Sequence, residues 1–167
     1  MSRLTTIEIQ KEECSFSAGH FTIFSATERE HLHGHNYYVS LALQTIVEHN
    51  GLTFDYRHFK QKLLGLCELL DRHLLLPKNS PYLTLEEQED YWIAHFNQQK
   101  MPFLKNDVVV LPVKNITIEE LAVWFLENIL KNQAEIDKYK ISKVIVKVYN
   151  GPGQAGKVEW CKSFYNK

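Results

Sequence analysis

The stretch Asn36–Val47, NYYVSLALQTIV, most constrains the fold, because its apolar and polar residues alternate. Its apolar face carries Tyr37, Val39, Leu41 and Leu43. This alternation is typical of a strand with one buried side. A sheet of such strands must cover its apolar face with helices or with a second sheet. The rest of the chain is therefore expected to supply that cover.

Three other segments predict strands. Residues 5–16 are rich in β-branched side chains, residues 141–150 alternate strictly, and residues 157–165 follow a GPGQAG turn. Two hairpins built from the four strands predict an antiparallel four-stranded sheet. Because such a sheet leaves edges open, we expect edge pairing between subunits.

Two helices complete the predicted domain. The first begins near Asp55, a candidate N-cap, and carries apolar residues at helical spacing until it must end before Pro77. The second begins after Thr117, another candidate N-cap, with two glutamates in its first turn. Between them lies an insertion, residues 77–114, where YWIAHF and DVVVLPV predict two short strands, interpreted as a hairpin. The order of the strands and helices along the chain predicts a single α+β domain over residues 1–167, with both helices on one face of the sheet.

Composition favours a soluble cytoplasmic protein. Its 44% hydrophobic and 23% charged residues are ordinary for a globular domain with one core. A formal net charge of −1 gives no electrostatic attraction to nucleic acid or to an acidic membrane surface. No apolar run reaches the roughly 18 residues of a membrane span, and the N-terminus lacks the apolar core of a signal peptide. Three cysteines, an odd number, predict reduced thiols.

Histidines gather in EREHLHGHNYYV, residues 28–39, where the alternating strand begins. His33 and His35 leave the same face of an extended chain, roughly 7 Å apart. His20, in FSAGHF, would lie beside them if its strand pairs with the next. Three neutral imidazoles that leave a fourth position open are typical of a catalytic zinc. From spacing alone, histidines that only hydrogen-bond remain an equal alternative, and His31 is out of step with the pair.

Five motifs in order carry a resemblance to a known family. They are FSAGH at 16–20, HGHNY at 33–37, TFDY at 53–56, LLDRHLLLP at 69–77 and NITIEEL at 115–121. Together they resemble the 6-pyruvoyl-tetrahydropterin synthase and 6-carboxytetrahydropterin synthase family. The resemblance implies a tunnelling fold (T-fold), in which sheet edges of several subunits join into a barrel. It also implies a homo-oligomer with active sites at subunit interfaces, a small-molecule pterin substrate, and Zn²⁺ on His20, His33 and His35.

The segment upstream of HGH departs from the family pattern. Most members carry a cysteine there as general base, but the corresponding positions are Thr27 and Arg29. Glu30 stands instead in the arrangement ExxHGH, which resembles a subfamily that cleaves dihydroneopterin triphosphate to 6-hydroxymethyl-dihydropterin, a folate precursor. A carboxylate can carry the proton of a retro-aldol cleavage while zinc acts as Lewis acid. The alternative interpretation of residues 28–30 is a solvated charged loop.

The family's Asp-His pair is altered as well. Asp71 corresponds to the aspartate, whereas Arg72 takes the place of the histidine and His73 follows one residue later. Asp71 and His73 are therefore the candidate partners of Glu30 in catalysis. Three alternatives stay open: His73 takes over the histidine's role, Arg72 does so beside Asp71, or this relay is lost.

The third departure concerns the pterin ring. Asn150 stands where the family has a glutamate that accepts two hydrogen bonds from the ring, and asparagine offers only one acceptor group. Gln154 could compensate, and Glu119 is a further candidate for substrate binding. The insertion at 81–112 has no counterpart in compact family members.

The leading hypothesis is a zinc-dependent lyase acting on 7,8-dihydroneopterin triphosphate or a related dihydropterin. One alternative is a 6-carboxytetrahydropterin synthase of queuosine biosynthesis, against which the missing cysteine argues. Another is a zinc-containing binding homologue without turnover, which Asn150 and the LDRH sequence favour.

Overall fold

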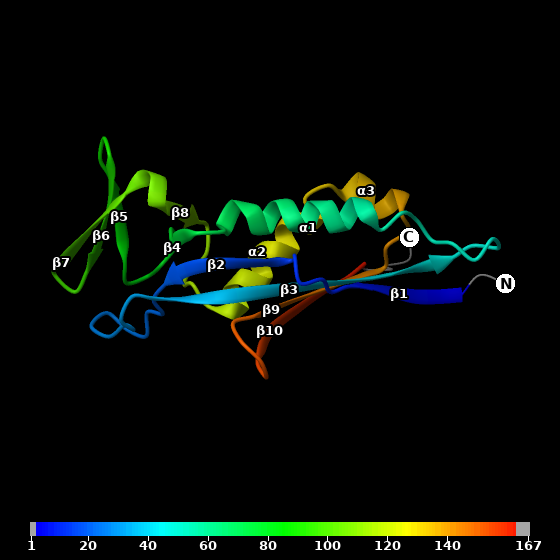
Figure 1. The fold of residues 1–167 in the computed structure, drawn as a ribbon, viewed down its shortest axis with the longest axis horizontal. Helices are drawn as coiled ribbons and strands as arrows, with labels where there is room; N and C mark the ends of the chain where they lie inside the picture. Colours follow the sequence, from blue (N-terminus) through cyan, green and yellow to red (C-terminus); the bar gives the residue numbers. More distant parts are fainter. Residues whose placement is uncertain (1–2, 163–167) are drawn as a thin grey trace, which may run out of the picture.

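The longest strand, β3 (His33–Val47), organises the sheet. One edge of β3 pairs with β9 (Lys143–Tyr149), and the other edge pairs with β2 (Ser15–His20) and then β1 (Arg3–Ile9), all antiparallel. The alternation predicted for this strand is confirmed, because Tyr37, Val39, Leu41 and Leu43 are all buried. The computed structural model describes residues 3–162 (Figure 1).

Besides these four strands, the main sheet contains β4 (His73–Pro77), β8 (Val108–Leu111) and β10 (Ala155–Cys161). Its seven strands have the order β10-β9-β3-β2-β4-β8, with β1 paired to β3 beside that path. The expected antiparallel strands are present, and the α+β class is confirmed. The expected first strand, 5–16, is however two strands separated by a turn. The end of the expected last strand, 163–165, lies outside the described residues.

The main sheet has three more strands than the four predicted: the expected first strand is two strands, part of the expected first helix is a strand, and one strand of the insertion joins this sheet. Helix α1 (Arg57–Leu70) ends before Asp71, and HLLLP forms β4, which pairs parallel with both β2 and β8. Arg72 makes the change of direction at a φ of 61°, in the left-handed region. The sheet is therefore mixed and seven-stranded rather than antiparallel and four-stranded.

Two long helices cover one face of the sheet, as predicted. The apolar residues of α1 and α2 (Ile118–Leu130) share a single buried cluster with the inward side chains of β2, β3 and β9. Thr117 caps α2 by accepting a hydrogen bond from the backbone N–H of Glu120. Asp55 lies one residue before the N-cap of α1 and accepts from the backbone N–H of Arg57 at 3.0 Å. A short helix, α3 (Gln133–Lys138), was not predicted. Within residues 3–162, no helix combines the length and apolarity that crossing a membrane requires.

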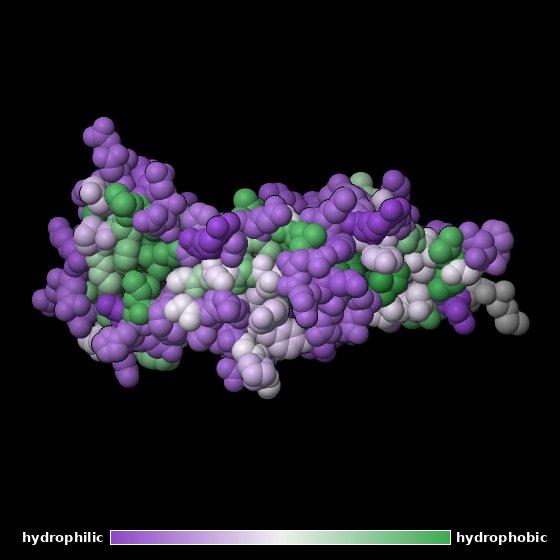
Figure 2. All heavy atoms as spheres, viewed as in Figure 1, coloured by the Kyte–Doolittle hydropathy of each residue, from purple (hydrophilic) through white to green (hydrophobic). Residues whose placement is uncertain are grey.

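The insertion forms a second sheet at one end of the elongated molecule (Figure 1). Its strands are β5 (Thr84–Glu87), β6 (Tyr91–Phe96) and β7 (Gln99–Leu104), followed by a 3-10 turn, η1 (Lys105–Asp107). The hairpin expected between YWIAHF and DVVVLPV is wrong, since β6 pairs with β5 and β7 while β8 joins the main sheet. A second apolar cluster, including Phe21, Leu76 and Phe96, joins the insertion to the main domain. Hydrophobic side chains also show on the surface at this end (Figure 2).

Candidate metal centre and active site

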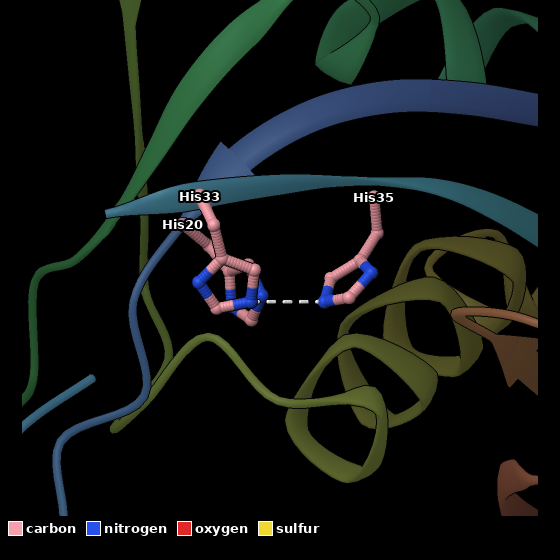
Figure 3. Close-up of side chains that lie close together, drawn as sticks. All are labelled: His20, His33 and His35. Atoms are coloured by element: carbon pink, nitrogen blue, oxygen red, sulfur yellow. Dashed lines mark hydrogen bonds between the residues drawn. The ribbon is translucent and has the colours of Figure 1, made fainter. Parts of the chain in front are cut away.

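Three histidines converge where β2 and β3 meet (Figure 3). His20, the last residue of β2, pairs in register with His33, the first residue of β3, and His35 follows two residues later. Their ring centroids lie 4.6 to 5.1 Å apart. One nitrogen from each ring lies within 4.8 Å of the other two. The antiparallel register thus assembles the cluster that the spacing of His33 and His35 and the placement of His20 predicted.

Two backbone carbonyls fix the tautomers of these rings. Nδ1 of His20 lies 2.9 Å from the carbonyl oxygen of Ile116, just before α2. Nδ1 of His33 lies 2.8 Å from the carbonyl oxygen of His31. Because a carbonyl only accepts, each Nδ1 must carry the proton, which leaves the lone pair on Nε2. His31, set aside as a ligand, thus contributes through its backbone.

The donor set fits a zinc ion. Nε2 of His20 is buried and has no hydrogen-bond partner within residues 3–162, and the Nε2 atoms of His33 and His35 lie 3.0 Å apart. Nitrogens bound at about 2.0–2.1 Å to a tetrahedral zinc stand roughly 3.3 Å from one another. Burial lowers the pKa of His20, which favours the neutral imidazole that a metal requires. Three imidazoles of this kind leave a fourth position for a substrate or water.

Glu30 is held beside the histidines by a reciprocal pair of hydrogen bonds with Thr22. The backbone N–H of Thr22 donates to Oε2 of Glu30, and the backbone N–H of Glu30 donates to the Thr22 carbonyl, both at 2.9 Å. Burial alone would raise the pKa of Glu30, but this pKa is lowered, and the hydrogen bonds with Thr22 are the leading cause that lowers it. The carboxylate is therefore ionised at neutral pH and able to accept a proton. Half-buried and hydrogen-bonded, Glu30 does not lie in a freely solvated loop.

Asn115 fastens this loop to the start of α2. Its Oδ1 accepts from the backbone N–H of Ile23 at 3.1 Å, and its Nδ2 donates to the carbonyl of the same residue at 2.8 Å. The neighbouring carbonyl of Ile116 is the one that orients His20. Asn115 belongs to the NITIEEL motif, but the sequence pattern alone does not indicate this role. One side chain therefore links the Glu30 loop and a histidine of the metal centre.

Asp71 and His73 both lie beside β2: Asp71 contacts Ser17, and His73 pairs with Ala18. Oδ1 of Asp71 accepts from the backbone N–H of Ser17 at 2.9 Å, which is the leading cause of the lowered pKa of Asp71. His73 pairs with Ala18, whose partner on the other side is His35, so His73 and His35 flank Ala18 across the sheet. Nδ1 of His73 is buried without a partner among the described residues. The side chain of Arg72, in contrast, is 87% exposed.

The candidate substrate-binding residues gather around the β9–β10 hairpin. Nε2 of Gln154 donates to Oδ1 of Asn150 at 3.0 Å, so the two amides are already joined. Glu119 lies in the first turn of α2, which packs directly on Gly156 of β10. A Cβ atom at Gly156 would stand 2.4 Å from backbone atoms of Ile118 and 2.7 Å from the backbone nitrogen of Glu119. The absence of a side chain at this position thus lets the hairpin approach α2.

Sequence comparison matches the chain to proteins of one kind, tetrahydropterin synthases. The sequence model of the family described as 6-pyruvoyl tetrahydropterin synthase matches residues 8–159. A protein of Methanocaldococcus jannaschii, provisionally assigned as a 6-carboxy-5,6,7,8-tetrahydropterin synthase, is 28% identical over 83% of this chain and 85% of its own length. A protein of Pyrococcus horikoshii with the same assignment is 26% identical over 82% of this chain and 80% of its own length.

Solved structures agree with this result. The 6-pyruvoyl tetrahydropterin synthase of Plasmodium vivax superposes with a TM-score of 0.89 at 28% identity, over 95% of this chain and 99% of that one. The Plasmodium falciparum enzyme gives a TM-score of 0.88 at 26% identity, over 95% and 98% of the two chains. The structural similarity includes the insertion, because these superpositions cover 95% of this chain. The protein has the T-fold expected from its motifs, and it belongs to the 6-pyruvoyl tetrahydropterin synthase family.

Proposed function

We propose that this protein is a zinc-dependent lyase that cleaves the side chain of 7,8-dihydroneopterin triphosphate, or of a closely related dihydropterin, and releases 6-hydroxymethyl-dihydropterin. The observation that carries the proposal is the arrangement of Glu30 beside the three converging imidazoles. His20, His33 and His35 would hold the zinc, which, when bound, supplies a Lewis acid for the side-chain oxygens.

Glu30 performs the proton transfer in this reaction. Its carboxylate takes the proton of the side-chain hydroxyl next to the carbon–carbon bond that breaks, and that oxygen becomes the carbonyl oxygen of the leaving aldehyde. The bonding electrons pass to the carbon that stays on the pterin, and Glu30 returns the proton to this carbon. The hydrogen bond from Thr22 keeps one carboxylate oxygen in place and leaves the other free for the transfer.

Two comparisons support a glutamate in this role. The Plasmodium vivax structures include variants of a catalytic residue in which a glutamate is replaced by alanine or by cysteine. This chain, at 27% identity to those variants, has Glu30 and no cysteine between Thr22 and His35. A thiolate general base is therefore absent from the loop that approaches the histidines.

The other candidate residues complete the proposed site. Asp71 and His73 act in proton transfer or orientation, and Asn150, Gln154 and Glu119 bind the pterin. The strands β10 and β8 end the main sheet on its two sides, and open sheet edges can pair with another copy of the chain. We therefore propose that the protein is a homo-oligomer in which neighbouring subunits complete each site.

A second candidate function is 6-carboxytetrahydropterin synthesis. The assignments of the archaeal relatives favour it. The glutamate at position 30, in place of the cysteine of most family members, favours side-chain cleavage instead. The nature of the product distinguishes the two functions.

The test is incubation of the zinc-loaded protein with dihydroneopterin triphosphate, with the pterin product identified by mass spectrometry. We expect 6-hydroxymethyl-dihydropterin from the wild type, and loss of this product in Glu30→Ala. Glu28→Ala is the matched control, because Glu28 is an exposed carboxylate in the same loop and its hydrogen bonds use backbone atoms. A 6-carboxy product would instead support the second function. Bound zinc without any turnover would indicate a binding protein.

A further inference from the structure

Arg29, the residue before Glu30, is held between two aromatic rings from different parts of the fold. Its guanidinium carbon lies 4.8 Å from the ring centroid of Phe21 and 5.8 Å from that of Phe96. Phe21 follows β2 in the main domain, whereas Phe96 ends β6 in the inserted sheet, and both rings are buried. A guanidinium is attracted to the face of an aromatic ring and stacks well on it because it is planar. Arg29 therefore joins the insertion to the Glu30 loop.

The same side chain also holds the backbone of Glu30. Nη1 of Arg29 donates to the carbonyl oxygen of Glu30 at 2.7 Å, and the backbone of Arg29 forms a bridge with Ile23. The Glu30 residue is thus fixed at three atoms: its carbonyl by Arg29, and its N–H and carboxylate by Thr22. Within residues 3–162, no carboxylate lies within ion-pair distance of Arg29, so its hydrogen bonding and stacking are directed to this loop and the two rings.

We propose that Arg29 is a positioning residue for Glu30, and that the inserted sheet supports the active site through Phe96. The inference rests on the proposed role of Glu30 as acid and base. A proton-transfer group must lie within hydrogen-bond reach of its substrate atom, so a small displacement of its backbone slows the chemical step. Arg29 occupies one of the positions at which the family pattern places a cysteine. In this chain the residue at that position, Arg29, orients the general base Glu30 and is not itself the base.

The experiment compares Arg29→Met, Arg29→Lys and Phe96→Leu by steady-state kinetics, with zinc content measured for each. We expect kcat of Arg29→Met to fall by about 10- to 100-fold with KM within about twofold, because substrate contacts remain while the base is misplaced. Lysine should restore part of kcat, since it keeps the charge and a donor but not the planar stack. Phe96→Leu should lower kcat in the same direction. Arg57→Met, which removes a largely exposed guanidinium near the start of α1, is the control and should leave kcat unchanged.

A rise in KM with unchanged kcat would overturn the proposal, because Arg29 would then contact the substrate itself, for example its phosphates. Unchanged kinetics would overturn it as well. If the wild type does not turn over the pterin, the proposed function fails separately, and hydrogen exchange still tests the positioning. Amide exchange at Thr22 and Glu30 should then be faster in Arg29→Met than in the wild type. Equal exchange rates would show that Arg29 does not fix the loop.

Discussion

Substitution of Gly156 by alanine tests how the hairpin, α2 and the metal centre are connected. The new Cβ would stand 2.4 Å from the backbone carbon and oxygen of Ile118, whereas ordinary contacts begin at 3.4 Å. Backbone atoms cannot rotate away as a side chain can, so the strand or the start of α2 must move by about 1 Å. Overpacking of this kind costs about 1–3 kcal/mol. For a chain of this length, 2 kcal/mol corresponds to a fall in Tm of roughly 4–8 °C.

The displacement should also reach the histidines, because the carbonyl of Ile116 orients His20. Loss of such an outer-shell hydrogen bond lowers metal affinity by about 10- to 100-fold. The assays are thermal unfolding of the metal-free protein and competitive zinc titration. Gly151→Ala is the matched control, because a Cβ there meets no atom within 4 Å and the backbone needs no positive φ. If Gly156→Ala equals the control in both assays, the hairpin does not pack on α2 as described.

Three other perturbations give separate tests. His33→Ala should weaken zinc binding by more than about 100-fold in a competitive titration while the far-ultraviolet circular dichroism spectrum is unchanged, because the side chain is a proposed ligand and does not belong to the buried core. Burial would raise the pKa of Glu135, but its hydrogen bond and ion pair with Lys62 outweigh burial and lower this pKa. The ionised carboxylate of Glu135 therefore stabilises the fold above its ordinary pKa of 4.5. This stabilisation is lost as the pH falls through the lower pKa that Glu135 has in the folded protein. Glu135→Gln should therefore lower the free energy of unfolding by about 1 kcal/mol at pH 7, and by less in acid, in denaturant titrations. Cys161 is exposed, whereas burial raises the pKa of Cys67 to about 12. A thiol reagent at pH 8 should react rapidly with Cys161 alone in the native protein, and with all three cysteines after unfolding.

Local patterns predicted much of the histidine cluster. The two-residue spacing of His33 and His35 places both imidazoles on one face of any extended chain, and β3 is extended there. The pairing of His20 with His33 required only that two successive strands form an antiparallel pair. Thr117 likewise caps α2 because a threonine before a helical segment accepts from an N–H of the first turn.

Long-range packing determined what the sequence could not predict. The run LLDRHLLLP is apolar enough for a helix end or a buried strand, and periodicity alone does not separate the two. Its strand form depends on partners far away in the chain, β2 and β8. The contacts of Arg29 and Asn115 could not be predicted for the same reason, since those with Phe96 and Ile23 exist only after the insertion and α2 have folded against the loop.

The measurement that tests the central claim most directly is the single-turnover rate of Glu30→Gln with zinc-loaded protein and dihydroneopterin triphosphate. Glutamine keeps the size of the side chain and an oxygen that can accept from Thr22, but it cannot take a proton. We predict a chemical step slower by about 10²- to 10⁴-fold, with the zinc content of the wild type. A Glu30→Gln variant that forms 6-hydroxymethyl-dihydropterin at the wild-type rate would contradict the assignment of Glu30 as the proton carrier.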